Sequence, residues 1–420
     1  MREMKDSGVP WIGEIPADWE VGRIKYNYYL KGRIGWQGLK ATEFIDEGPY
    51  LVTGTDFRNG KVDWSTCYHI SQERYDEAPE IHVRLGDLLI TKDGTVGKVA
   101  YIDEKPEKVS LNSHLLIMRP TNSSYENRYL FWVIQSPVFD KYFGLSQNGT
   151  IMASLSQEKI NDFSFAKPKL EIQEKISHFL DEKCFAIDTL RSNIEKQIEK
   201  LEEYKKSVIF EAVTKGLDPT VPMKDSGVPW IGAVPEHWLT TRLKFAIECL
   251  DGKRVPIDAG QREAGPYPYW GAGSIVDYVN SYLFDEEIVL LGEDGAPFFD
   301  DSRPVAFFVN EKVWVNNHIH VLKAKPNISP KFLVHFLNIV NYRDYINGSI
   351  LAKLTQGNMK EIALLIPHIS EQTAIASYLD SRCTAIDSII ADKKKQLSTL
   401  DEYKKSLIYE YVTGKKEVPA

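Results

Sequence analysis

The strongest structural signal in the chain is the segment "QEKISHFLDEKCFAIDTLRSNIEKQIEKLEEYKKSVIFEAVTKG" (residues 173–216), because it occurs twice. The second copy, "QTAIASYLDSRCTAIDSIIADKKKQLSTLDEYKKSLIYEYVTGK", begins at Gln372, an offset of 199 residues. Neither copy contains Gly or Pro before Gly216 and Gly414, and apolar residues recur at heptad spacing, with one break at Lys393. Each copy is therefore predicted to form a helix of about 40 residues, roughly 60 Å long.

A helix of this length cannot bury its apolar stripe alone, and the nearest complementary surface is that of its own copy. We expect the two helices to pack as an antiparallel coiled coil. The residues predicted to form the seam are Leu180, Ile187, Ile194, Leu201, Val208, Leu379, Ile386, Leu400 and Leu407.

A second repeat opens each half of the chain. The ten residues "MKDSGVPWIG" occupy positions 4–13 and recur unchanged at 223–232, an offset of 219 residues. Because this offset differs from that of the helices, the two halves share a constant frame around inserts of unequal length. The frame tryptophans Trp11, Trp19, Trp230 and Trp238 are candidates either for packing where a helix meets an insert or for contact with a partner protein.

The repeats divide the chain into six segments. They are an N-terminal frame segment (1–26), a first insert (27–165), a central helix (166–217), a repeated frame segment (218–245), a second insert (246–366) and a C-terminal helix (367–420). The predicted fold class is α+β, with two mixed α/β domains joined by two long antiparallel helices and an internal pseudo-twofold repeat.

Both inserts contain short apolar runs at Asp-Gly turns, predicted as strands, each followed by a predicted helix, at 126–143 and 330–346. They also share short landmarks, which suggests two diverged versions of one domain. The landmarks are Lys92-Asp93-Gly94 with Glu293-Asp294-Gly295, and Asn112-Ser113-His114 with Asn316-Asn317-His318.

Composition narrows the class of protein. A length of 420 residues with 43% hydrophobic and 11% aromatic residues is typical of a folded protein of two or three domains. The net charge of −8 argues against a generally basic nucleic-acid-coating surface, but it permits local patches that read DNA. The four isolated cysteines and the lack of a long apolar run favour a reducing, cytoplasmic location.

Catalytic and metal-binding motifs are missing from the sequence. It has no phosphate-binding GxxxxGK[ST] loop, no Asp/Asn-Pro-Pro-Tyr/Phe stretch for base methylation, and no Ser, His and Asp constellation. His318 and His320 would share one face of a strand, yet no Cys or acidic residue completes a metal set at a fixed spacing. We predict no catalytic residue and no metal site, and a structural role for these histidines, with base contact as the alternative.

Several features together resemble the specificity subunit of type I restriction-modification systems. They are the frame repeats, the Pro-x(4)-Gln entries to the helices (Pro168 to Gln173, Pro367 to Gln372), the helices themselves, and the insert phrases "YPYWGAGSIVDYV", "EIVLLGEDGA" and "WVNNHIHVL". The resemblance covers essentially the whole chain in the same order.

The resemblance implies a non-catalytic subunit whose inserts are target recognition domains, each reading half of a split, asymmetric DNA site. The helices would set the spacing between half-sites, and the frame would bind two methyltransferase subunits. Two restriction and motor subunits would complete the complex. It implies no cofactor in this chain, with S-adenosylmethionine, ATP and Mg²⁺ in the partner subunits.

Polar and basic side chains in Gly-rich loops are the candidates for DNA contact, because base edges are read mainly by Arg, Lys, Asn and Gln. In the first insert they are Lys31, Arg33, Gln37, Lys40, Arg58, Lys92 and Asn148. In the second they are Lys253, Arg254, Arg262, Arg303 and Lys353. Two other functions stay open on the residues alone: a coiled-coil scaffold without DNA contact, and a DNA-modifying enzyme with fused recognition domains.

Overall fold

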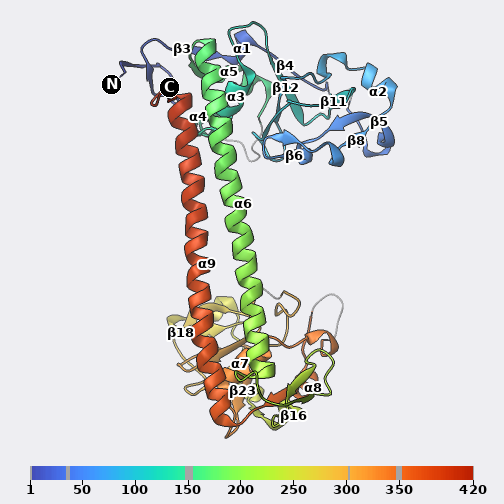
Figure 1. Cartoon of the computed structure of the whole chain (residues 1–420), viewed down its shortest axis with the longest axis vertical. Helices are drawn as coiled ribbons and strands as arrows, with labels where there is room; N and C mark the ends of the chain where they lie inside the picture. Colours follow the sequence, from blue (N-terminus) through green and yellow to red (C-terminus); the bar gives the residue numbers. More distant parts are fainter. Residues whose placement is uncertain (1, 35–37, 147–154, 301–302, 347–351, 420) are drawn as a thin grey trace. The chain divides into compact units, whose positions relative to one another are not determined.

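A computed structural model describes residues 2–34, 38–146, 155–300, 303–346 and 352–419. The chain divides into two compact units, and each contains one insert, one copy of the frame and half of each long helix. Unit 1 comprises residues 1–193 and 396–420, and unit 2 comprises residues 194–395. Both units are mixed α and β, and Figure 1 labels their elements.

Unit 1 is built mainly from short strands. They are β1 (Met4–Asp6), β2 (Glu14–Pro16), β3 (Glu20–Arg23), β4 (Tyr28–Gly32), β5 (Ile45–Val52), β6 (Phe57–Arg58), β7 (Lys61–Val62), β8 (Tyr68–His69), β9 (Leu88–Thr91), β10 (Val99–Tyr101), β11 (Val109–Leu111), β12 (Leu115–Pro120) and β13 (Ser164–Lys167). Its shorter helices are α1 (Ile24–Asn27), α2 (Gln72–Asp76), α3 (Asn127–Ile134), α4 (Pro137–Ser146) and α5 (Gln157–Asp162).

A four-stranded antiparallel sheet, in the order β10-β9-β12-β4, forms the centre of the insert in unit 1. The strands β9 and β12 are apolar on both faces, and both faces are covered. One face contributes to a core shared with α3, α4 and the long helices. The other face packs with a three-stranded sheet, β11-β5-β8, in which β11 and β5 are parallel.

Unit 2 repeats this topology with different residues. Its strands are β14 (Met223–Asp225), β15 (Ala233–Pro235), β16 (Leu239–Arg242), β17 (Ile247–Cys249), β18 (Ala264–Trp270), β19 (Ile275–Val279), β20 (Ile288–Gly292), β21 (Ala306–Val309), β22 (Trp314–Val315), β23 (Ile319–Ala324) and β24 (Ala363–Ile366), and its shorter helices are α7 (Pro330–Leu337) and α8 (Gln356–Glu361). The sheets run β17-β23-β20-β21 and β19-β18-β22, again with one parallel pair, β18 and β22. The inserts are thus two versions of one domain.

The two single helices predicted in the inserts are each interrupted, which corrects the sequence prediction. In place of 126–143, α3 ends at Ile134 and α4 begins at Pro137, whose ring lacks the N–H that a continuous helix needs. In place of 330–346, α7 ends at Leu337. The next residue, Asn338, hydrogen-bonds to the neighbouring chain. Its Oδ1 accepts from the backbone N–H groups of Val305 and Ala306, and its Nδ2 donates to the carbonyl oxygen of Ala306.

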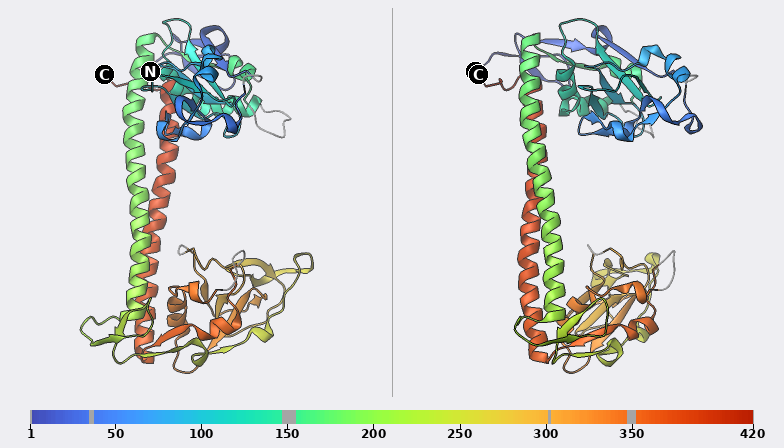
Figure 2. Two further views of the ribbon diagram at one scale, coloured as in Figure 1. Left: turned by 90° about the vertical axis from the view of Figure 1, so that its right-hand side faces the viewer. Right: turned by 45° about the vertical axis from the view of Figure 1, so that its right-hand side comes forward.

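The two long helices are α6 (Leu170–Lys215) and α9 (Ile369–Val412). Within each unit, half of α6 lies beside half of α9 and runs in the opposite direction (Figures 1 and 2). The heptad residues Leu180, Ile187, Ile194, Val208, Leu379, Ile386 and Leu407 are buried, and Leu201 and Leu400 are half-buried.

Matching ion pairs cross between the helices in the two units. In unit 1, Lys404 Nζ lies 2.6 Å from Asp188 Oδ1. In unit 2, Lys205 Nζ lies 2.7 Å from Asp387 Oδ2. An offset of 199 residues converts each member of one pair into a member of the other, so the helix–helix packing follows the sequence repeat.

Each long helix ends against a frame tryptophan. Gly414 and Gly216 follow the ends of α9 and α6 with φ of +70° and +78°, a left-handed conformation that glycine adopts without strain. A Cβ on Gly414 would lie 2.5 Å from the Pro16 ring, and one on Gly216 would lie 3.3 Å from Trp238. Figure 2 shows these helix ends beside the frame strands of the same unit.

The glutamine of each Pro-x(4)-Gln entry is buried and joins the long helix to the insert. Gln173 Oε1 accepts the backbone N–H of Glu126, 2.9 Å away, at the start of α3. Gln372 Oε1 accepts that of Ser329, also 2.9 Å away, at the start of α7. Both amide groups also donate to the carbonyl oxygen of their own Pro-x(4)-Gln proline. The two inserts are therefore attached to their helices by the same hydrogen bonds.

A second attachment lies two turns further along each long helix. Asp181 on α6 binds Arg128, with an N–O distance of 2.7 Å, and accepts from Trp132 Nε1, both on α3. At the equivalent place, Asp380 on α9 binds Lys331 and His335 on α7. Equivalent aspartates of the two long helices thus bind different side chains of the two inserts.

Candidate nucleic-acid interface

Two loops meet at one edge of the central sheet in unit 1. The backbone N–H of Lys92, after β9, donates to the carbonyl oxygen of His114 at 2.9 Å. Asn112 Oδ1 accepts the backbone N–H of His114 at 3.0 Å, an Asx turn that fixes the loop. His114 Nδ1 lies 3.4 Å from Asp93 Oδ2. We call Asn112, His114 and Asp93 the first corner.

The same arrangement occurs in unit 2. The backbone N–H of Glu293, after β20, donates to the carbonyl oxygen of His318 at 3.0 Å, and Asn316 Oδ1 accepts the N–H of His318 at 2.8 Å. His318 Nδ1 lies 3.6 Å from Asp294 Oδ2. We call Asn316, His318 and Asp294 the second corner. The landmarks shared by the two inserts therefore occupy matching places.

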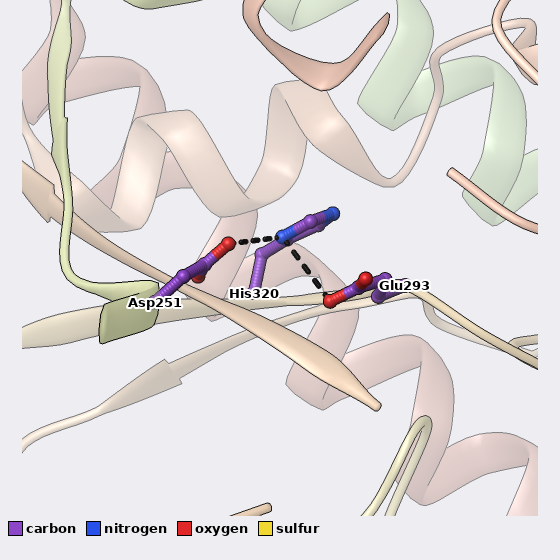
Figure 3. A group of neighbouring side chains, drawn as sticks. All are labelled: Asp251, Glu293 and His320. Atoms are coloured by element: carbon purple, nitrogen blue, oxygen red, sulfur yellow. Dashed lines mark hydrogen bonds and ion pairs between the residues drawn. The ribbon is translucent and has the colours of Figure 1, made fainter. Parts of the chain in front are cut away.

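A cluster of charged side chains adjoins the second corner in the sequence, where Glu293 precedes Asp294 and His320 lies two residues after His318. Figure 3 shows three members of this cluster. His320 has no exposed surface. Its Nδ1 is 2.7 Å from Asp251 Oδ2 and 3.6 Å from Glu293 Oε2, and its Nε2 is 2.8 Å from the carbonyl oxygen of Leu354. Arg254 Nη1 lies 2.6 Å from Glu293 Oε2. We call Asp251, Arg254, Glu293 and His320 the charge cluster.

Asp251, Glu293 and His320 have the donor atoms for a metal ion, since these atoms lie within 4.8 Å of one another. The geometry does not favour one. Both ring nitrogens of His320 already have hydrogen-bond partners, Asp251 and the carbonyl oxygen of Leu354. Arg254 pairs with both carboxylates, at 3.5 Å for Asp251 and 2.6 Å for Glu293, so the candidate ligand groups are engaged within the chain. The structure shows hydrogen bonds and ion pairs within this cluster, and the absence of a metal site stays a prediction from the sequence.

The charge cluster stabilises the ionised form of Asp251. Burial alone would raise the pKa of this carboxyl, but hydrogen bonds from His320 and from the backbone N–H of Val321, with the nearby charge of Arg254, lower it from 3.8 to about 2. Asp251 is thus charged at neutral pH although it is almost fully buried.

Three arginines predicted to contact DNA are held by the protein itself. Arg33 is buried, and its Nε donates to the carbonyl oxygen of Leu111 at 2.8 Å. Arg254 belongs to the charge cluster. Arg262 lies over the Tyr269 ring at 4.3 Å and pairs with Asp277. In the free chain, these contacts give the three guanidinium groups structural roles. The Gly-rich surroundings of the arginines in the sequence do not indicate such roles.

The other predicted DNA contacts are more accessible. The side chains of Lys31, Lys40 and Lys253 are exposed, Lys92 is half-buried beside the first corner, and Lys353 lies 3.8 Å from Asp294 Oδ2 in the second. Arg58 lines a hollow of about 470 Å³, and Arg303 one of about 210 Å³. Two further candidates, Gln37 and Asn148, lie outside the described residues.

The frame tryptophans divide into two kinds. Trp19 and Trp238 are fully buried at the helix ends. Trp11 and Trp230 are half-buried against their own inserts; Trp11 Nε1 donates to the carbonyl oxygen of Ser164, and Trp230 lies 6.2 Å from the Phe336 ring. All four tryptophans therefore pack within their own unit, and contact of Trp11 and Trp230 with a partner protein stays a prediction.

The sequence did not reveal the charge cluster. Asp251, Glu293 and His320 come from three separate strand ends, with no short spacing that a motif could capture. His318 and His320 were expected to share one face, but His318 is exposed whereas His320 is buried. The only sequence signal was the insert-to-insert match of Asn316 and His318 with Asn112 and His114.

No helix in the described part of the chain is long and apolar enough to cross a membrane.

Comparison with known proteins relates the whole chain to one group. The family described as "Type I restriction modification DNA specificity domain" matches residues 18–200 and 235–399. A putative type I restriction enzyme MjaX specificity subunit from Methanocaldococcus jannaschii is 26% identical, over 96% of this chain and 95% of that protein. A putative type I restriction enzyme specificity subunit from Haemophilus influenzae is 36% identical over 33% of this chain and 35% of its own length.

Solved structures agree on the fold. A chain from a study of "complex assembly and conformational transition of the type I R-M system" superposes with a TM-score of 0.73 and 12% identity, covering 96% of this chain and 99% of that one. The HsdS subunit from Thermoanaerobacter tengcongensis superposes with a TM-score of 0.53 and 14% identity, covering 96% of this chain and 98% of that one.

Proposed function

Because the chain belongs to the family of type I restriction-modification DNA specificity subunits, we propose that each insert reads one half of a bipartite, asymmetric DNA site. The chain is the sequence-recognition subunit of such a system and is not itself an enzyme. The observation that carries the proposal is the repetition of one domain topology with different loop residues, since a shared scaffold with different side chains is suited to reading two different half-sites.

The attachment of the inserts supports independent reading. Gln173 and Gln372 hold α3 and α7 by equivalent hydrogen bonds, and Asp181 and Asp380 repeat the pattern. Because these frame contacts repeat while the loops of the two inserts differ, an insert can change its loops without changing the helices. The alternative function, a coiled-coil scaffold without DNA contact, leaves the divergence of the loops unexplained.

The partners follow from the family, and the number of copies is part of our proposal. Exposed apolar side chains recur at equivalent frame positions, Tyr26 with Phe245 and Leu190 with Ile389. A partner that binds one such surface has a matching surface in the other unit, which supports two methyltransferase subunits per chain. Two restriction and motor subunits would complete the assembly. We expect the assembly to act in the cytoplasm, where it has access to DNA.

The cofactors belong to the partners in this proposal. S-adenosylmethionine would bind the methyltransferase subunits, and ATP with Mg²⁺ the restriction subunits. The acidic net charge of this chain is compatible with such partners supplying much of the phosphate neutralisation.

An exchange of inserts tests the proposal. Residues 27–165 would be replaced by the corresponding insert of another specificity subunit, and adenine methylation would be mapped across the genome of cells that express the chain with its methyltransferase. We expect one half of the methylated sequence to change and the other half to stay the same.

The reciprocal exchange of residues 246–366 is the matched control, and it should change only the other half. A methylated sequence that survives both exchanges would contradict reading by the inserts. Loss of all methylation by a folded, assembled exchange variant would contradict their independence.

A further inference from the structure

The two corners are the best-matched exposed features of the inserts. His114 and His318 have exposed side-chain fractions of 61% and 51%, yet the same pattern of backbone and Asn hydrogen bonds fixes the loop of each. The residues around them differ, with Lys92 in one unit where Glu293 stands in the other. The corners have thus stayed alike where the neighbouring loop residues have diverged.

What the corners share limits what they can contact. Two domains that read different half-sites meet different base edges, so identical groups are poorly suited to specify both. The sugar–phosphate backbone is the part of DNA that is the same in every half-site, and contacts to it position a protein without specifying sequence. Building on the proposed function, we propose that His114 and His318 each bind a DNA phosphate and set the distance of their insert from the duplex.

The carboxylate of each corner has a defined role in this contact. Asp93 Oδ2 lies 3.4 Å from His114 Nδ1, within hydrogen-bond distance, and Asp294 Oδ2 lies 3.6 Å from His318 Nδ1, within ion-pair distance. Each carboxylate can therefore orient its ring from the Nδ1 side. The Nε2–H on the opposite side of the ring then donates to a phosphate oxygen. An imidazolium held between the carboxylate and the phosphate donates from both nitrogens. Asp93 and Asp294 are thus positioning residues, and the histidines make the contact.

The test uses the complex of the full chain with its methyltransferase. Binding to a DNA duplex that contains the recognised site would be measured between 50 and 200 mM salt for wild type and for the double variant H114A/H318A. We expect the affinity to fall about tenfold for each histidine removed. We also expect the slope of log K against log salt to fall by about 0.9 for each lost phosphate contact. The methylated sequence should be unchanged.

Two further variants sharpen the test. In H114Q/H318Q the side-chain amide keeps a neutral donor, so the affinity should fall less than in the alanine variant, with a similar loss of slope. In D93A/D294A we expect weaker binding, because the rings lose their orienting acceptor. Stronger binding by this variant would overturn the proposal, since it would mean that the aspartates only repel DNA.

The control is His368→Ala, which removes an exposed histidine that lies outside the corners and hydrogen-bonds to Ser370. This variant should bind DNA with the affinity of wild type.

Two results would overturn the proposal. One is wild-type affinity and salt slope in folded H114A/H318A. The other is a changed methylated sequence in that variant, which would indicate that the histidines read bases. A wild-type complex that methylates no specific sequence would instead contradict the proposed function itself.

Discussion

Asp251 is the residue on which the charge cluster of unit 2 depends. Its two oxygens accept from His320 and from the backbone of Val321, and it is almost fully buried. Asp251→Asn would remove the buried carboxylate that pairs with His320 and Arg254. We expect a loss of about 3 kcal/mol in the free energy of unfolding of unit 2, measured by urea denaturation. The matched control, Asp277→Asn on exposed surface, should cost less than about 1 kcal/mol.

The same residue predicts a pH dependence. The pKa of Asp251 is about 2 in the folded chain, below the 3.8 of an ordinary carboxyl. Its stabilisation is therefore fully present above about pH 4 and is lost as the pH falls through 2. The difference in unfolding free energy between wild type and Asp251→Asn should shrink as the pH is lowered from 6 towards 3. A difference that grew over this range would show that Asp251 is not held in its ionised form.

At the scale of elements, the join between α9 and α7 depends on one amide. Gln372→Leu keeps roughly the same side-chain volume but leaves the Ser329 N–H and the carbonyl oxygens of Asn327 and Pro367 without their side-chain partner. We expect a loss of about 3 kcal/mol and faster hydrogen exchange in the first turn of α7. Gln396→Leu, at an exposed position of the same helix, is the control and should leave both measurements unchanged. If hydrogen exchange in α7 were the same in Gln372→Leu as in wild type, the hydrogen bonds of Gln372 would not be what stabilises the start of α7.

For the whole molecule, α6 is the covalent link between the two inserts, and α9 follows the second insert in the chain. Deletion of residues 195–201 together with 394–400 removes one heptad from each helix and leaves the Asp188–Lys404 and Lys205–Asp387 pairs present. Seven residues correspond to about 10 Å of helix, or roughly three base pairs. If the helices set the spacing, the gap of the methylated sequence should shorten by about that amount while both half-sites persist.

Deletion of one heptad from α6 alone is the comparison. It would shift the seam of one helix past the other, and we expect loss of methylation without a new gap. A double deletion that left the gap unchanged would contradict the role of the helices in spacing.

Heptad spacing and the sequence repeats were sufficient to predict the helices and the duplicated domain, because these signals are periodic or local. The break before Pro137 shows the limit of periodicity, since the apolar pattern of 126–143 continues across a residue that cannot donate its backbone hydrogen bond. The burial of Arg33 and the pairing of Asp251 with His320 depend on contacts between residues about 70 or more positions apart. No local pattern records such contacts, so the loop context and residue type that make these arginines candidates for DNA contact do not reveal their partners within the chain.

The repeated ion pairs between α6 and α9 disfavour a parallel arrangement of the two helices. Each copy of the helix contains both an acidic and a basic member, Asp188 with Lys205 and Asp387 with Lys404. An antiparallel arrangement brings opposite charges together in both units. A parallel, in-register arrangement of the same sequences would instead place Asp188 opposite Asp387 and Lys205 opposite Lys404, repulsion at both positions. The duplicated helix is therefore self-complementary in one orientation and self-repelling in the other, a choice of direction that apolar heptads alone do not make.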